Sequence, residues 1–239
     1  MDLKETDILG DSIDQHWYYR SKALAMKRLL DDKPCSSILD VGAGSGFFSK
    51  QLLSSTNAKE AWCVDISYEN EFDATEAGKP IHFRKSIDSV SADIVLLMDV
   101  LEHVDDDTGL LQEYVAKVPS GARFIISVPA FQFLWSSHDV FLEHRRRYKV
   151  NQIENVARRA GLNIQYGSYY FGAVFPIAAS IRLTEKIFHR SHRQTPRSQL
   201  TQHHPLVNAT LATMCAIELP LLKINRLAGL TVFCVAEKP

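Results

Sequence analysis

The sequence has few of the features that set a protein apart from ordinary globular domains. Its four cysteines are widely scattered and form no Cys-x-x-Cys pair, which favours buried free thiols over a redox centre. No apolar run approaches the ~20 residues that a membrane-spanning helix needs. The formal net charge is −1 and there is no long basic tail, so bulk binding of nucleic acid is disfavoured.

The first residues, Met1 to Asp7, are polar and acidic, unlike the charged and then apolar start of a secretory signal. Together with the absence of paired cysteines, this start predicts a cytoplasmic protein. A length of 239 residues with 46% hydrophobic and 23% charged residues predicts a single large globular domain.

The stretch from Ser37 to Ser49 is the most informative part of the chain. A short apolar run is followed by Gly42, Gly44 and Gly46 and then by a helical apolar pattern. A strand, a tight glycine turn and a helix N-terminus form a place where exposed backbone N–H groups can hold a polar ligand. The spacing is G-x-G-x-G rather than the G-x-G-x-x-G of dinucleotide-binding turns, and Asp40 would be unfavourable beside a pyrophosphate.

Strand-like and helix-like patterns alternate along the chain, which predicts an α/β fold with a mainly parallel, doubly wound sheet of seven strands. The piece between the second and third strands is short and polar, so we expect at most a rudimentary helix there. The predicted strands are 36–41, 61–65, 81–85, 92–98, 122–128, 163–170 and 230–236. The predicted helices are 12–30, 46–55, 107–117 and 150–160, with further helix-like apolar segments at 174–188 and 205–224.

Three ordered motifs resemble those of class I S-adenosylmethionine-dependent methyltransferases. They are the glycine turn, the segment from Asp93 to Val104 that reads DIVLLMDVLEHV, and the turn at Pro119 to Gly121 before an apolar strand. The resemblance implies a Rossmann-like methyltransferase fold. It also implies S-adenosylmethionine as cofactor and methyl transfer by in-line displacement, which needs no metal, and we assign no metal ligands.

The resemblance also implies where the cofactor binds. The glycine turn would approach its methionine portion, Asp40 would face its ammonium group, and Asp65 at the end of the second strand would accept the ribose hydroxyls. Relatives commonly have an acidic residue at the position of Ser86, so the adenine contacts are the weakest part of this assignment. The predicted cofactor-binding residues are Trp17, Arg20, Asp40, Gly42, Ala43, Gly44, Gly46, Asp65, Ile66, Ser86, Ile87 and Met98.

The candidate catalytic residues are Asp99, His103 and His138. Asp99 ends the fourth strand and is expected in the wall of the methyl-transfer pocket, the alternative being a helix cap. His103 is either a base or a packing residue near the cofactor, because imidazole titrates near neutrality. His138 with Asp139 would supply a base oriented by a carboxylate, although adjacent side chains rarely bond to each other.

A loop after the fifth strand carries the predicted substrate contacts. They are Asp139, His144, Arg147 and Tyr148. The run Arg145 to Arg147 is either an anion clamp, since guanidinium groups match phosphate or carboxylate, or a solvated charge run.

Two further segments are similar to a bacterial subgroup, the methyltransferase-23-like or type-11-like enzymes. They are His16 to Arg20, which reads HWYYR, and Pro129 to Tyr148. In that subgroup's pattern, the aromatic helix at the N-terminus would cover the cofactor site, or would simply be packed by its aromatics.

We divide the single domain into a helical lid at 1–33, a core at 34–171, an insertion at 172–226 and a last strand at 227–239. The insertion joins two apolar segments through a basic connector, and basic amphipathic segments can lie on anionic membranes. We therefore expect a small-molecule or lipid-linked acceptor, with peripheral contact of residues 172–203 at the inner membrane. The alternatives for the insertion are a cover for the sheet or a homodimer contact.

Other functions remain open at this stage. They are methylation of a protein or peptide, an NAD-dependent oxidoreductase, which the glycine spacing disfavours, and a scaffold that binds the cofactor without turnover. A nucleic-acid amino-methyltransferase is disfavoured because Asp99 to Glu102 does not match the N/D-P-P-Y/F tetrad that grips a flipped base.

Overall fold

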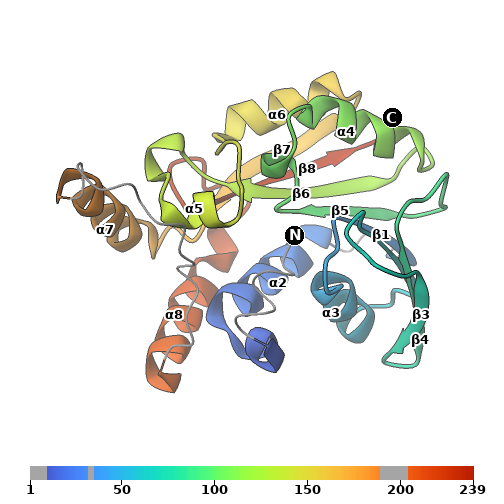
Figure 1. The fold of residues 1–239 in the computed structure, drawn as a ribbon, viewed down its shortest axis with the longest axis horizontal. Coiled ribbons are helices and arrows are strands. Elements are labelled where there is room, and N and C mark those ends of the chain that lie inside the picture. The colour runs from blue at the N-terminus through green and yellow to red at the C-terminus, as the bar shows by residue number, and fades with distance from the viewer. Residues whose placement is uncertain (1–9, 32–34, 189–203) are drawn as a thin grey trace.

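The computed structural model describes residues 10–31, 35–188 and 204–239, which build one eight-stranded sheet with helices on both faces (Figure 1). The strand order across the sheet is β3-β4-β2-β1-β5-β6-β8-β7. The strands are β1 (Ser37–Val41), β2 (Glu60–Val64), β3 (Phe72–Glu76), β4 (Lys79–Arg84), β5 (Ile94–Met98), β6 (Arg123–Pro129), β7 (Asn163–Tyr170) and β8 (Thr231–Glu237).

The direction of the strands creates the binding edge of the sheet. Strands β4, β2, β1, β5 and β6 are parallel, whereas β8 runs antiparallel between β6 and β7. From β1 the chain builds the sheet outward through β2 and β4, and then returns to add β5 and β6 on the other side. Ligands of open α/β sheets bind at the carboxyl ends of the strands beside such a reversal, which here lies between β1 and β5.

The predicted α/β class is confirmed, but the sheet has one strand more than the seven expected. Residues 72–76 form β3, an edge strand that pairs antiparallel with β4, in place of the rudimentary helix. Ala77 and Gly78 between them have φ of 50° and 76°, and a two-residue turn with two positive φ values closes a β-hairpin. Because β3 is mostly exposed, its sequence lacks the apolar alternation that would reveal a strand.

Two apolar cores form because the central strands are buried on both faces. In β1, Ile38 belongs to the core under α2, α3 and α8, and Leu39 belongs to the core under α4 and α6. The helices on the first face are α2 (Trp17–Leu30), α3 (Phe47–Ser55) and α8 (Pro205–Glu218), and those on the second are α4 (Asp107–Ala116) and α6 (Val150–Arg159). The four cysteines are buried and free, as expected from the sequence.

Residues between β7 and β8 add helices at the carboxyl edge of the sheet. Helix α8 packs on α2, where Asn208 accepts a hydrogen bond from the Trp17 N–H (2.8 Å) and donates one to the Gln15 carbonyl (2.8 Å). The Tyr170 hydroxyl donates to the Cys215 carbonyl on α8 (3.1 Å). The remaining elements are α5 (Ser137–Phe141), α7 (Phe175–Phe188) and the short 3₁₀ helices η1 (Gly10–Gln15), η2 (Leu101–His103), η3 (Gln132–Leu134) and η4 (Leu219–Leu221).

Among the described residues, no helix combines the length and apolar character that crossing a bilayer requires. The basic connector of the predicted membrane contact, 189–203, lies outside the described residues.

The turn that joins β1 to α3 yields a stability prediction. Gly46 has φ of 72°, and a Cβ there would lie 3.1 Å from the Phe83 ring and 3.3 Å from the Cys63 sulfur. Gly46→Ala should lower the free energy of unfolding by more than the ~1–2 kcal/mol that left-handed backbone costs a non-glycine residue. Gly78→Ala is the matched control, since its φ is 76° and nothing lies within 4 Å of the added Cβ. Urea unfolding that shows equal losses in the two variants would contradict the packing argument.

Candidate functional site

The glycine turn lies at the carboxyl ends of β1 and β2, as the sequence predicts. Gly42, Gly44 and Gly46 all have positive φ, from 54° to 72°. A Cβ at Gly42 would lie 2.7 Å from a methyl group of Val100, so the turn has no space for a side chain there. The N–H groups of Gly42 and Ala43 donate to the Val64 carbonyl, which fastens the turn to the end of β2. The result is a backbone-lined cradle.

Two carboxylates fix this cradle. Asp65 accepts hydrogen bonds from the Gly44 N–H (3.0 Å) and from the N–H of Ser67 (2.9 Å). Burial opposes ionisation of Asp65, but the hydrogen bonds from Ser67 and Gly44 lower its pKa below the ordinary value. Asp40 is buried and accepts from the Ser49 hydroxyl (2.8 Å), which ties the end of β1 to α3. Asp65 is therefore bonded to the turn that the sequence analysis assigns to the cofactor, and Asp40 braces the helix that follows it.

The other predicted cofactor residues differ in how exposed they are. Ile66, directly after Asp65, is a large apolar side chain that is 91% exposed at the sheet edge. Ser86 is exposed, Ile87 packs on the second core, and Met98 is buried in the first. Their contact with a cofactor stays a prediction.

The aromatic helix predicted to cover the cofactor site begins beside the carboxyl edge. Trp17 packs edge-on against Phe171 (ring centroids 5.7 Å apart), and Tyr18 stacks on the same ring (5.2 Å). Arg20 is exposed on α2. Trp17 and Tyr18 line the cavity described next, whereas Arg20, which the sequence analysis expects at the cofactor site, does not.

A cavity of about 580 Å³ opens at the carboxyl ends of β5 and β6. Side chains from α2, α5, α7 and α8 enclose it, and most of them are apolar. Its polar residues include Asp99, Glu102, His138, His144, Arg147 and Arg182. Asp99 follows directly after β5, so the cavity lies on the same edge of the sheet as the glycine cradle.

Asp99 is held by three side chains. It forms an ion pair with the Lys22 ammonium, accepts from the Ser127 hydroxyl (3.0 Å), and lies 3.4 Å from the Tyr18 hydroxyl. Lys22 is fully buried; burial is the largest single effect and lowers its pKa, but Asp99, Tyr18 and Glu102 together outweigh burial and raise the pKa overall. Asp99 is therefore an anion fixed by a buried cation, which suits a wall of the pocket better than a proton acceptor.

Sequence reasoning missed Lys22. A signal was present, because Lys22 follows Tyr18 by four residues and so lies on the same face of the helix. A lysine on the apolar face of a helix requires a buried anion, and Asp99 is the one it meets.

Asp139 contacts His144, a partner that the sequence analysis did not expect, and the role of His138 as a base stays a prediction. The Asp139 carboxylate is fully buried and contacts His144 Nδ1 (2.9 Å). Neighbouring residues of a helix point in different directions, so His138 cannot share this contact from α5. Burial, with the nearby Arg182 charge, lowers the pKa of His138 to about 4, and the ring is neutral near pH 7.

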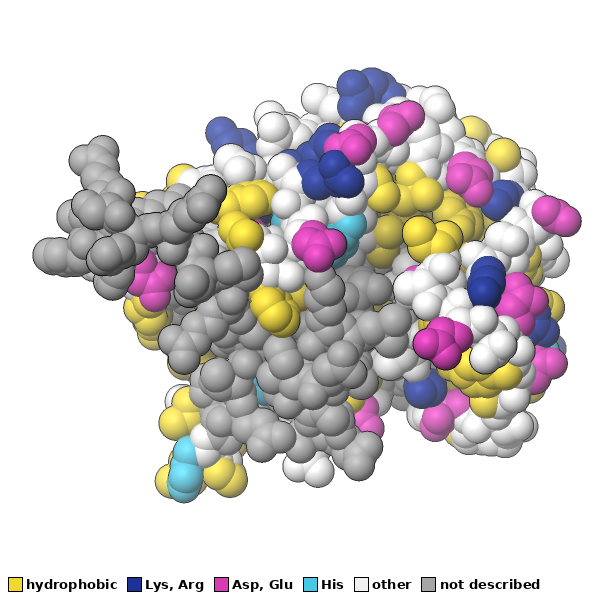
Figure 2. Space-filling view, viewed as in Figure 1, with side chains coloured by type: hydrophobic (Ala, Val, Ile, Leu, Met, Phe, Trp, Pro, Cys, Tyr) yellow, Lys and Arg dark blue, Asp and Glu magenta, His cyan; other side chains and the backbone are white. Residues whose placement is uncertain are grey.

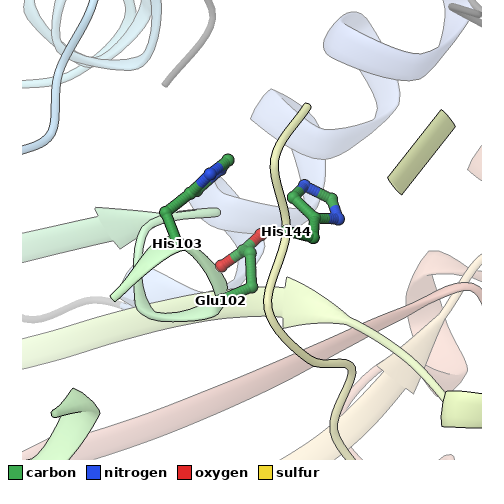
Figure 3. Close-up of side chains that lie close together, drawn as sticks. All are labelled: Glu102, His103 and His144. Atoms are coloured by element: carbon green, nitrogen blue, oxygen red, sulfur yellow. The ribbon is translucent and has the colours of Figure 1, made fainter. Parts of the chain in front are cut away.

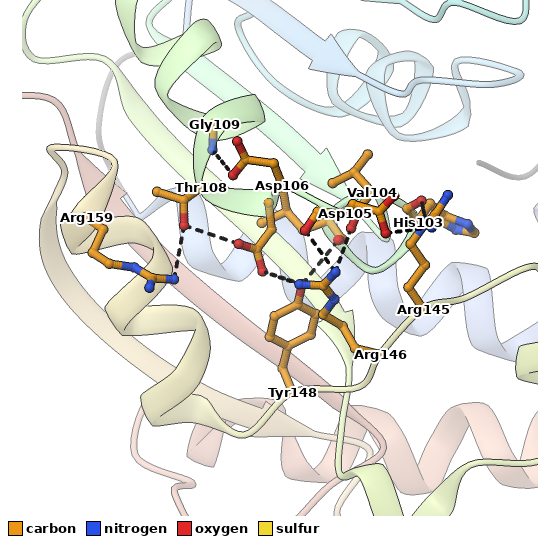
Figure 4. Close-up of polar contacts among 12 residues, drawn as sticks. His103, Val104, Asp105, Asp106, Thr108, Gly109, Arg145, Arg146, Tyr148 and Arg159 are labelled. Carbon is orange, nitrogen blue, oxygen red and sulfur yellow. Dashed lines mark hydrogen bonds and ion pairs between the residues drawn. The ribbon is translucent and has the colours of Figure 1, made fainter.

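The arginine run is occupied by contacts within the chain (Figure 4). Arg145 donates to the His103 carbonyl (2.8 Å), and Arg146 donates to the carbonyls of Val104 (3.1 Å) and Asp105 (2.9 Å). These two arginines hold the loop after η2, so the anion clamp is wrong for them.

Arg147 and Tyr148 complete the predicted substrate residues. Arg147 is buried and donates through Nε (2.7 Å) and a terminal nitrogen (2.9 Å) to Asp139. It also lines the cavity, so contact with an acceptor stays a prediction. The Tyr148 hydroxyl instead bonds to the Leu101 carbonyl (3.1 Å) and to Asp107 (2.9 Å), away from the cavity (Figure 4). These contacts give the Tyr148 hydroxyl a structural role, and its part in substrate binding stays a prediction.

The His103 ring packs edge-on against His144, with ring centroids 4.8 Å apart. Glu102, between Leu101 and His103 in the sequence motif, lines the cavity and is fully buried. The sequence analysis passed over Glu102, although a carboxyl beside a histidine at a strand end was a usable signal.

The pairing of Lys22 with Asp99 can be tested by Lys22→Met. Removing one partner leaves a mostly buried charge unpaired, which should lower the free energy of unfolding by about 3 kcal/mol. Adding Asp99→Asn to this variant should recover part of the loss, because the remaining charge is then absent. Lys27→Met, at an exposed position of the same helix, should stay within about 0.5 kcal/mol of the parent. Additive effects of the two substitutions in chemical denaturation would rule out the proposed coupling.

Comparison with known proteins agrees with this geometry. The model of a family described as a methyltransferase domain matches residues 15–166. A S-adenosylmethionine-dependent methyltransferase from Archaeoglobus fulgidus is similar in structure, with a TM-score of 0.55, 14% identity, and coverage of 99% of this chain and 98% of that one. No curated protein sequence matches.

Two further structures share the fold at 17% identity. One is a chain of the complex between the Haloferax volcanii Trm112 methyltransferase activator and a methyltransferase (TM-score 0.56, covering 95% of this chain and 92% of that one). The other is phosphoethanolamine N-methyltransferase 2 of Haemonchus contortus (TM-score 0.55, 98% and 56%), of which this chain spans little more than half. The bacterial subgroup stays a prediction. The chain belongs to the methyltransferase-domain family and is a class I S-adenosylmethionine-dependent methyltransferase.

Proposed function

We propose that the enzyme transfers a methyl group from S-adenosylmethionine to a small-molecule or lipid-linked acceptor with an apolar body. The cavity of about 580 Å³ carries this proposal. It is partly open to solvent and mostly apolar, with a few polar groups at one side, and a lining of this kind suits a small ligand. It shares the carboxyl edge of the sheet with the glycine cradle, so donor and acceptor can meet near Asp99.

The donor would occupy the cradle as the sequence analysis assigns it. The turn at Gly42 to Gly46 allows close backbone approach, and the ionised Asp65 faces the position expected for ribose hydroxyls. The exposed Ile66 gives the adenine ring an apolar surface at the mouth of the site. Asp40, although bonded to Ser49, carries the negative charge that suits the ammonium group.

The chemistry requires mainly alignment. The sulfonium carries its own leaving group, so the protein must hold the acceptor atom in line with the methyl–sulfur bond. The fixed ion pair of Lys22 and Asp99 gives this part of the wall a rigid geometry. Among the expected catalytic residues, His138 would act as a neutral group, because its pKa is about 4.

The shape of the cavity favours a small acceptor over a protein or peptide. Helices α7 and α8 cover one side, and Leu142, Ala178 and Leu211 line it. The visible face in Figure 2 intermingles Lys and Arg with Asp and Glu side chains, unlike the one-signed surface that nucleic acid requires.

Membrane contact through 172–203 and a homodimer contact stay predictions. In support of an apolar partner, α7 and α8 expose Ile177, Ile181, Leu206 and Ile217.

Asp65→Ala tests the donor site. Loss of hydrogen bonds to a charged acceptor should weaken binding of S-adenosylmethionine by about 1–3 kcal/mol in calorimetry. Asp73→Ala is the control, because Asp73 is an exposed carboxylate of the edge strand β3 paired with His82 and Arg84. Equal affinity of Asp65→Ala and Asp73→Ala for the donor would refute the assignment of the cradle.

Ala178→Arg tests the acceptor site. A long charged side chain at a cavity-lining position should remove methyl transfer to acceptors from a metabolite extract, detected with labelled donor, while donor affinity stays unchanged. Ser180→Arg introduces the same charge on the exposed side of α7 and should retain activity. Retained transfer in Ala178→Arg would show that acceptors bind elsewhere.

A further inference from the structure

Glu102 carries a buried carboxyl group to which no other described residue donates a hydrogen bond. Its side chain is fully buried on η2, and neither carboxylate oxygen has a partner among the described residues. Buried polar groups in proteins are nearly always bonded, and an unpaired buried charge is costly. A proton or a bound cation must therefore compensate it.

Two imidazole rings surround this carboxyl group. Figure 3 shows Glu102 and His103 from η2 converging with His144, which comes from the loop leading to α6. One potential ligand atom of each residue lies within 4.8 Å of the other two. Ligands of one metal ion, each at about 2.1 Å, lie some 3–4 Å apart, so small side-chain movements would bring the three together.

The orientation of His144 is set by a buried carboxylate. Its Nδ1 lies 2.9 Å from Asp139, which is itself fixed by Arg147 and by the Ser136 N–H (2.8 Å). Nδ1–H donating to Asp139 leaves the lone pair on Nε2, the form of imidazole that binds metals. A histidine held by a carboxylate in this way is the usual arrangement behind a metal ligand.

Lys22 and Arg147 act on Glu102 through their charges, but each of them is bonded to another carboxylate. Lys22 is paired with Asp99, and the Arg147 guanidinium is bonded to Asp139 and to the Ala130 carbonyl. The charges of Asp99 and Asp139 are thus balanced, whereas that of Glu102 is not.

We propose that Glu102, His103 and His144 bind one divalent transition-metal ion, such as Mn²⁺, Co²⁺ or Zn²⁺, with its remaining coordination positions open to the cavity. Two imidazoles and one carboxylate are a ligand set for these ions rather than for Mg²⁺ or Ca²⁺. The sequence analysis assigns no metal because methyl transfer does not require one.

The site also narrows the acceptor, a step that rests on the proposed function. A metal ion lowers the pKa of a bound hydroxyl, which then releases its proton to water. The resulting oxygen forms a bond to the methyl carbon as the sulfur–methyl bond breaks, and the electron pair of that bond stays on sulfur. Acceptor oxygens are therefore expected, and the ion leaves the reaction unchanged.

The direct test is metal binding by the full chain after treatment with a chelator. Titration with Co²⁺, followed by its visible absorption and by calorimetry, should show one tight site. Glu102→Gln should weaken it more than ten-fold, and Asp139→Asn should weaken it by ~10–100-fold, as is typical for groups that orient a ligand. His138→Gln is the matched control, because His138 lines the same cavity outside the cluster.

The substitution at Glu102 removes an unpaired buried charge, so without metal the variant should unfold at the same temperature as the parent or higher. Equal Co²⁺ affinity of the parent and Glu102→Gln would overturn the proposal. So would binding that disappears only when His189, His192 and His203 are replaced. Neither S-adenosylmethionine nor an acceptor is present in this test. The metal site can therefore be refuted while the proposed methyl transfer stands, and the proposed methyl transfer can be refuted while the metal site stands.

Discussion

The ion pair of Lys22 and Asp99 joins the parts of the molecule on which the site depends. Asp99 stands at the end of β5, beside the reversal in strand order, and Lys22 belongs to the helix that covers this edge. That helix also carries Trp17 and Tyr18 into the cavity wall, and α8 packs against it. A buried ammonium binds this helix to one position on the sheet, because any other position would leave both charges unpaired in an apolar region.

The structural features that could be predicted from the sequence are those that depend on a local pattern of residue types. The glycine turn and the seven core strands were recognisable because backbone geometry and burial on both faces leave residue-type signals, such as Gly46 at positive φ and the apolar run of β5. Pairings between distant residues leave no such signal. Nothing local in the sequence links Lys22 to Asp99 or Asp139 to His144, and the adjacency of His138 to Asp139 was misleading. Edge strand β3 was missed for a different reason: it is exposed and has no core-facing alternation.

The Asp139 contact shows how a fold can position a functional group without using it directly. Asp139 is held by Arg147 and by the backbone of Ser136, and it fixes one nitrogen of His144. The arginine run that resembles an anion clamp is in large part the support of this loop, because Arg145 and Arg146 bind the carbonyls that follow η2. Hydrogen bonds and ion pairs therefore brace the loop after β6 where it meets the cluster.

Charge balance connects the cluster to the kind of acceptor. Lys22 is bonded to Asp99 and Arg147 to Asp139, so among these three carboxyl groups Glu102 is the one to which no described cation is bonded. A proton would neutralise Glu102 but would leave its oxygens without partners, whereas a divalent ion would engage them and leave one positive charge in excess. An acceptor oxygen that loses its proton cancels that excess, and a neutral amine does not. The unpaired carboxylate thus favours an acceptor that becomes an anion before it receives the methyl group.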